Sequence, residues 1–133
     1  MRVMIGAIAT AVVWVAATPA VAHHAFSAEF DSEKPVKLTG AVTSVRWSNP
    51  HAWVYIDVQD DDGAVVNWAL EFGGANALYR RGWRQDDVKP GTLITIEGFQ
   101  ARSGTPTANA RNIALPDGRR LFSGEAPSEG VSQ

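Results

Sequence analysis

The 133-residue sequence contains no cysteine. Such a domain forms no disulfide, and it has no thiolate to act as a nucleophile, a zinc ligand or a lipid-modified anchor. Histidine is also scarce, with three residues in the whole chain. Any metal site must therefore use nitrogen and oxygen donors, and these three imidazoles are the main candidates.

Positive charge is not in excess. Lys and Arg number 12 against 14 Asp and Glu, which gives a formal net charge of −2. This balance argues against nucleic acid as a partner, because binding to phosphates depends on clustered Lys and Arg. The sequence also lacks a Gly-x-Ser-x-Gly nucleophile motif and a phosphate-binding loop, which argues against hydrolytic chemistry. We expect a binding protein rather than an enzyme, and a redox enzyme that uses copper is a further alternative, for which the sequence indicates no substrate.

Long apolar runs are confined to the start of the chain. Arg2 is the only charged residue among the first 22, the run from Val3 to Ala17 is largely apolar, and Ala20-Val21-Ala22 follows. This pattern predicts a signal peptide over residues 1–22 and export to the periplasm, with no stable membrane anchor after cleavage. An uncleaved anchor is the alternative, since the apolar run approaches the ~20 residues that span a bilayer. Cleavage after Ala22 and cleavage after Ala20 both fit.

The remaining chain alternates apolar and polar residues with period two, which is typical of half-buried strands. We predict successive strands over residues 36–47, 52–59, 65–72, 92–101 and 108–115. A phase slip at Thr43 and Ser44 predicts a bulge, and Asp62-Gly63 predicts a tight hairpin. A short helix is expected over residues 75–81, ending at Gly82.

This order predicts an all-β fold with one short helix, an OB-fold-like five-stranded small barrel. The barrel domain is expected over residues 23–122 with an N-terminal extension at 23–35, and residues 123–133 are expected to be a disordered tail. A six-stranded meander or small sandwich is the alternative. Barrels of this type bind ligands at loops that correspond here to Ser48–His51 and Arg102–Asn109.

Several segments carry a family resemblance that covers nearly all of the chain after residue 22. They include HHAFSAEFD, LTGAVTSVRWSNPHAWVYIDV, VNWALEF and NALYRRGW. In these segments the chain resembles a family of small secreted proteobacterial proteins known only as a domain of unknown function. The resemblance implies export and a small β-barrel, and it implies no activity.

The three histidines, His23, His24 and His51, are the candidate metal ligands. Cleavage after Ala22 would make His23 the first residue, so that its free amine and its imidazole form a bidentate chelate. An α-amino group with a pKa of ~7.7 to 8 loses its proton to a divalent metal at modest cost, and this nitrogen set suits Cu(II). His51 from the SNPH turn would complete an arrangement similar to a histidine brace, with His24 as a fourth donor or facing solvent.

Two other interpretations of the histidines remain open. Cleavage after Ala20 would place His23 third in the mature chain, where it can bind copper together with backbone amides and without His51. Alternatively, His51 forms a hydrogen bond that holds its turn, and the chain-end histidines are merely polar.

Aromatic residues flank the same turn. Trp47, Trp53 and Tyr55, with Asn49 in the turn, could form a platform on which a flat small ligand stacks. Alternatively, these rings cover the helix or the N-terminal segment. We therefore expect an exported periplasmic protein that binds copper or another small ligand, or else a structural or interaction module of the cell envelope that binds no metal.

Overall fold

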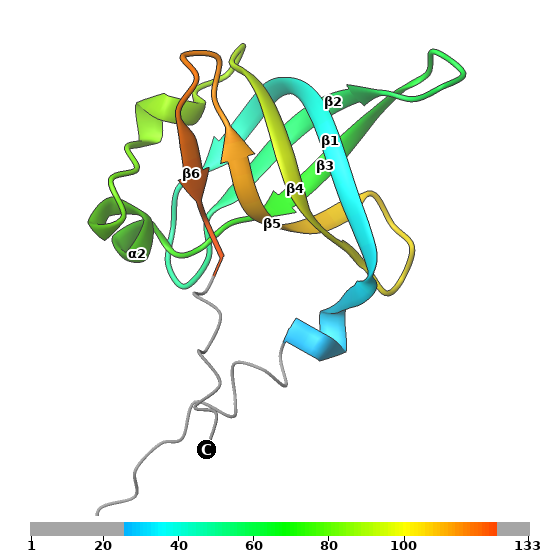
Figure 1. Cartoon of the computed structure of the whole chain (residues 1–133), viewed down its shortest axis with the longest axis horizontal. Helices are drawn as coiled ribbons and strands as arrows, with labels where there is room; N and C mark the ends of the chain where they lie inside the picture. The colour runs from blue at the N-terminus through cyan, green and yellow to red at the C-terminus, as the bar shows by residue number, and fades with distance from the viewer. Residues whose placement is uncertain (1–25, 125–133) are drawn as a thin grey trace, which may run out of the picture.

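The computed structural model describes residues 26–124, which form a strongly curved sheet of six strands with short helices at its ends (Figure 1). The strands are β1 (Phe30–Arg46), β2 (Trp53–Gln59), β3 (Val65–Glu71), β4 (Leu93–Ala101), β5 (Thr107–Ala114) and β6 (Arg120–Phe122). Between β3 and β4 the chain forms the helix α2 (Ala75–Arg80) and a 3-10 helix, η1 (Gln85–Val88). Residues 26–29 form one further helical turn before β1.

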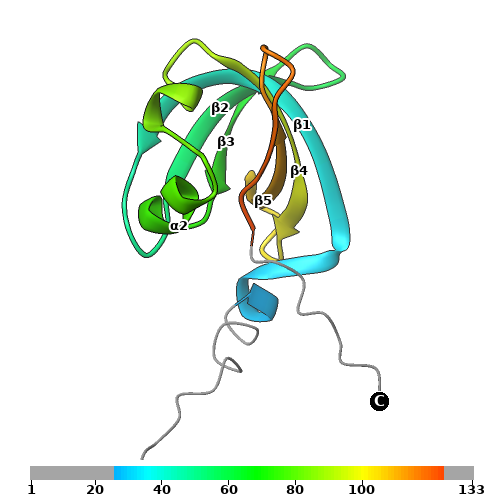
Figure 2. The same ribbon diagram turned by 60° about the vertical axis from the view of Figure 1, so that its left-hand side comes forward.

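The first five strands close into a ring. Neighbours in the order β3-β2-β1-β4-β5-β6 pair antiparallel, and β3 also pairs with β5 in parallel, with Leu70 opposite Ala108. Figure 2 shows the resulting barrel with α2 at its lower end. The predicted OB-fold-like small barrel is therefore confirmed. Its sixth strand lies outside the ring, as a short addition along β5.

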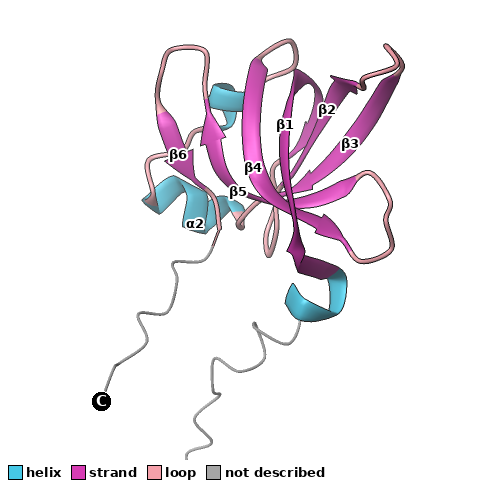
Figure 3. Ribbon diagram, turned by 45° about the vertical axis from the view of Figure 1, so that its right-hand side comes forward, coloured by secondary structure: helices cyan, strands magenta, loops and turns pink. Residues whose placement is uncertain are grey.

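β1 is longer than the sequence pattern indicates. It begins at Phe30 and not at Val36, so the part of the expected extension from residue 30 to residue 35 belongs to the barrel. Because β1 has 17 residues, it can pair with β4 over its first part and with β2 over its last part, bending between them (Figure 3). The bend includes a register shift between Val42 and Ser44, which confirms the predicted bulge.

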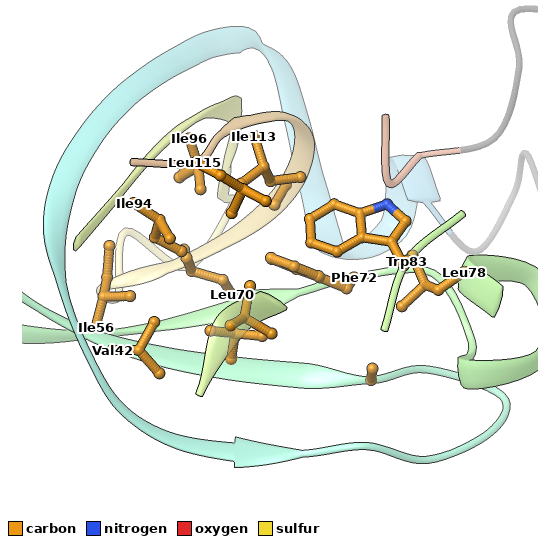
Figure 4. Close-up of a cluster of buried hydrophobic side chains, with 14 of the residues drawn as sticks. Val42, Ile56, Leu70, Phe72, Leu78, Trp83, Ile94, Ile96, Ile113 and Leu115 are labelled. Atoms are coloured by element: carbon orange, nitrogen blue, oxygen red, sulfur yellow. The ribbon is translucent and has the colours of Figure 1, made fainter. Parts of the chain in front are cut away.

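The inward positions of the strands and of α2 form a single core (Figure 4). Its largest member, Trp83, is fully buried, and the sequence pattern did not place it in the core. The indole ring packs edge-on against Phe72 at 5.5 Å between ring centroids, and its Nε1 donates a hydrogen bond of 3.3 Å to the carbonyl oxygen of Phe122. Trp83 thus seals the end of the barrel beneath α2.

Packing continues past the predicted start of the tail at residue 123. Ser123 is fully buried, its backbone N–H donates to the carbonyl oxygen of Arg111, and its Oγ accepts a hydrogen bond from Gly73 N–H. The ordered fold therefore extends to Gly124, and the rest of the expected tail lies outside the described residues. Among residues 26–124, no helix is long and apolar enough to cross a membrane.

Candidate functional site

The SNPH turn between β1 and β2 is fastened to the start of α2. Ala75 N–H donates to the carbonyl oxygen of Ser48 at 3.0 Å, and Asn76 N–H donates to Oδ1 of Asn49 at 3.1 Å. Asn49 thereby supplies the side-chain acceptor that the N-cap residue of α2, Gly74, lacks. A Cβ atom at Gly74 would collide with the carbonyl oxygen of Pro50, so the turn and the helix approach each other as closely as backbones allow. The side-chain oxygen of Asn49 is therefore engaged in holding the helix and is not free to bind a ligand.

His51 leaves this turn and reaches the end of β3. Its Nδ1 lies 3.3 Å from the carbonyl oxygen of Phe72 and 3.7 Å from Oε1 of Glu71. A carbonyl oxygen can only accept, so the contact with Phe72 requires a proton on Nδ1. In the neutral form of the ring, Nε2 then carries the lone pair, and Nε2 makes no hydrogen bond within residues 26–124. About half of the side chain, 51 %, is exposed, so this lone pair is accessible.

Glu71 is the residue of this site that the sequence analysis did not single out. It is 8 % exposed, and burial raises the pKa of its carboxyl group. The nearby His51 and a hydrogen bond from Asn109 oppose this rise in pKa, whereas the charge of Glu29 adds to it. Alternation along β3 puts Glu71 on the face opposite to that of its neighbour Leu70, which points into the core. No local signal shows that β5 and the turn cover that position.

Polar contacts continue from Glu71 to the N-terminal segment. Asn109 Nδ2 donates to Oε1 of Glu71 at 3.1 Å, and Arg111 Nε donates to Oδ1 of Asn109 at 2.9 Å. The Arg111 guanidinium in turn lies 4.8 Å from the ring centre of Phe26. Phe26 also packs against Phe30, at 5.7 Å between ring centroids, so the N-terminal segment is docked on the barrel at this ring.

His23 and His24 lie outside the described residues. Phe26 follows them closely in the chain, and the helical turn of residues 26–29 lies at the same end of the barrel as the SNPH turn (Figure 1; Figure 2). Among residues 26–124, no group of three or more His, Cys, Asp and Glu side chains could hold a metal ion. A metal bound at His51 would therefore need ligands from beyond this part of the chain.

The predicted aromatic platform divides into two parts. Trp53 and Tyr55 lie half-buried on the outward face of β2, alternating with the buried Val54. Trp53 pairs with Glu71 across the sheet, and Tyr55 pairs with Ala69. Trp47, in contrast, packs against the core.

Residues on this outward face are paired from strand to strand around the barrel. Arg46, Trp53, Glu71 and Asn109 follow one another on β1, β2, β3 and β5, each opposite the next. The strands therefore place a half-exposed indole, a buried carboxylate and its amide partner in one row, with His51 approaching from the turn. Such a row can hold a cation or a polar ligand at its His51 end.

One family model matches this chain over residues 11–110, and its description is Family of unknown function (DUF6152). The chain belongs to this family. No curated protein and no solved structure matches it significantly. The DUF6152 assignment fits the resemblance seen in the sequence, and it brings no activity or ligand with it.

Proposed function

We propose that this DUF6152 protein is exported to the periplasm and binds Cu(II) through its mature N-terminus together with the NPH turn. The amine and imidazole of His23 form the chelate, Nε2 of His51 is the third nitrogen ligand, and His24 is either a fourth donor or faces solvent. The observation that carries the proposal is that Nδ1 of His51 contacts the carbonyl oxygen of Phe72, while Nε2 makes no hydrogen bond within residues 26–124 and the side chain is half-exposed.

Nδ1 of His51 has the kind of partners that support a metal-binding role for the other ring nitrogen. Imidazole ligands in proteins almost always donate their second ring N–H to a carbonyl or carboxylate oxygen, which fixes the ring and raises its basicity. His51 has both acceptors within reach, the carbonyl oxygen of Phe72 at 3.3 Å and Oε1 of Glu71 at 3.7 Å. These contacts also hold the turn, so they serve the purely structural alternative equally well, and the unbonded Nε2 is what favours a ligand.

The docking of Phe26 supports the participation of the chain end. Phe26 stacks against Phe30 and meets Phe99 edge-on at 5.9 Å, so the chain is anchored soon after His23 and His24. Each residue spans at most ~3.3–3.6 Å, which limits how far these histidines can stray from the anchor. Glu29 is near enough to Glu71 for its charge to affect the pKa of that carboxyl group, so the anchored segment approaches the His51 site.

The test uses protein purified from the periplasm with its native chain end, because an N-terminal tag would destroy the amine ligand. N-terminal sequencing establishes the cleavage site, and calorimetric titration with Cu(II) measures the affinity. We expect a clear loss of affinity for His51→Ala and for a variant with one alanine added before His23. His24→Ala is the matched control, which reports whether the neighbouring imidazole takes part.

Two outcomes would contradict the proposal. If both the His51 variant and the extended variant bind Cu(II) as tightly as the parent, no brace forms. If sequencing instead shows a start at Val21, copper binding that is insensitive to His51 identifies His23 as a third-position ligand with backbone nitrogens.

We keep one alternative, an interaction module of the cell envelope that binds no metal. It is favoured by the half-exposed Trp53 and Tyr55 on the outward face of β2. Metal analysis of the native protein separates the two functions, since this alternative requires protein without copper. It also requires binding to an envelope partner that Trp53→Ala abolishes and His51→Ala retains.

A further inference from the structure

A groove lies on the outer face of β1, β4, β5 and β6. Lys37, Glu97, Asn112 and Phe122 are opposite one another across these four strands and form one row on that face. Their neighbours Ile96 and Ile113 point into the core, so the row faces outward. Figure 1 shows the four strands side by side.

The row forms the shared boundary of two hollows, of ≈ 500 Å³ and ≈ 290 Å³. The larger hollow alone lies within the range of about 300–1,000 Å³ that is usual for small-molecule sites. Its apolar lining residues are Pro35, Val36, Phe99 and Phe122. The groove therefore offers an apolar surface, bounded by two aromatic rings, to a narrow ligand.

The charged residues that line the two hollows are mostly cationic. They are Lys37, Arg111 and Arg120, against a single carboxylate, Glu97. Glu97 lies 3.5 Å from Lys37, so these two charges are already paired. This positive groove contrasts with the formal net charge of −2 of the whole chain. Local complementarity therefore favours an anionic ligand.

Arg111 is held in place and still has free donors. Its Nε donates to Asn109, and its guanidinium stacks over the rings of Phe26 and Phe99 at 4.8 and 5.7 Å. The two terminal nitrogens make no hydrogen bond and no ion pair within residues 26–124. A pre-oriented guanidinium with two free terminal NH2 groups matches the two oxygens of a carboxylate.

We propose that this groove binds a small amphiphilic carboxylate, with the carboxylate on Arg111 and an alkyl chain over Phe99 and Phe122. The apolar lining favours the chain, since burying it removes apolar surface from water. The free end of Arg111 favours the carboxylate, because a charge-assisted pair is about twice as strong as a neutral hydrogen bond. This site shares no ligand atom with the proposed copper centre and does not depend on it.

The experiment titrates metal-free protein with octanoate, kept below the concentration at which it forms micelles. Calorimetry measures the affinity, and amide chemical shifts map the site. We expect shifts concentrated at Phe99, Asn112 and Phe122, and binding at least about tenfold weaker for Arg111→Gln, a loss of about 1.4 kcal/mol. The matched control is Arg80→Gln, which removes the same charge from the exposed end of α2 and leaves octanoate binding unchanged.

A second variant and a second ligand keep the proposal testable if Arg111→Gln unfolds. Asn112→Trp fills the groove from an exposed position and is expected to block octanoate. 1-Octanol has the same chain without the charge, and we expect it to bind at least about tenfold more weakly. The proposal is overturned if octanoate does not bind, if octanol binds equally well, if folded Arg111 or Asn112 variants bind as the parent does, or if the shifts lie elsewhere.

Discussion

Nδ1 of His51 lies 3.7 Å from Oε1 of Glu71, and this contact joins the NPH turn to the end of β3. The two partners are unequal, since the side chain of His51 is 51 % exposed and that of Glu71 only 11 %. Glu71 is a buried acid whose loss of hydration is partly offset by His51 and by Asn109. The pair thus fixes the imidazole at a site where its second nitrogen faces solvent.

Glu71→Gln is expected to remove the contribution of this carboxyl group to the pH dependence of the free energy of unfolding. Burial raises the folded-state pKa of Glu71 above its ordinary value of 4.5. Between these two pKa values the folded state binds more protons than the unfolded state, so the free energy of unfolding falls as pH rises. Glutamine does not ionise and can still accept from Asn109. The variant should therefore gain stability relative to the parent as pH increases above about 4.5.

Urea unfolding of both proteins at several pH values between 4 and 7.5 measures this difference. Glu33→Gln, at an exposed position of β1, controls for the loss of one carboxylate. If the parent instead gains stability relative to Glu71→Gln over this range, pairing with His51 outweighs the cost of burial.

Asn49→Ala is expected to loosen the start of α2. The substitution removes the acceptor for Asn76 N–H, a loss comparable to that of an N-cap and worth about 1 kcal/mol. Asn49→Asp keeps the acceptor oxygen and should retain most of the stability. Thermal unfolding gives the cost, and amide hydrogen exchange at Asn76 reports the local effect. Equal protection of Asn76 in the alanine and aspartate variants would show that this hydrogen bond does not hold the helix.

Trp83→Ala is expected to cost about 3–5 kcal/mol, because it leaves a large cavity where a fully buried indole contacts Phe72. Tyr79→Ala, at a residue that is 62 % exposed, should change the stability by no more than about 1 kcal/mol. Chemical unfolding of both variants tests the contrast. Similar losses at the two positions would mean that Trp83 does not close the core.

Phe26→Ala is expected to weaken Cu(II) binding although it removes no ligand. The ring anchors the N-terminal segment on Phe30, Phe99 and Arg111. Without the ring the chain end is more flexible, so chelation of the metal costs more conformational entropy. Copper titration of the untagged protein measures the effect, with Val65→Ala, at an exposed apolar residue, as the control. An unchanged affinity for Phe26→Ala would favour copper binding by the chain end alone.

The local patterns of the sequence predict most of the elements, because alternation and turn chemistry act between near neighbours. Val54, Ile56 and Leu70 point inward as the period of two requires, and the bulge lies where the phase slips. The start of β1 is missed because residues 31–35 are mostly polar and show no alternation, and in this part of β1 only Phe30 and Pro35 pair with β4, across an irregularity in the register. Trp83 is missed because it lies between two short helices, where no period applies.

The sequence by itself determined the succession of strands along the chain, the positions of the turns and the candidate ligands, since each of these depends on residues close together along the chain. Only the tertiary structure decided which polar side chains meet. Closure of the ring brings Asn109 to Glu71 across 38 residues, and the same closure buries that carboxylate beside His51. A contact between distant strands leaves no periodic trace in either strand, because alternation selects the face of a residue but not the neighbour that covers it.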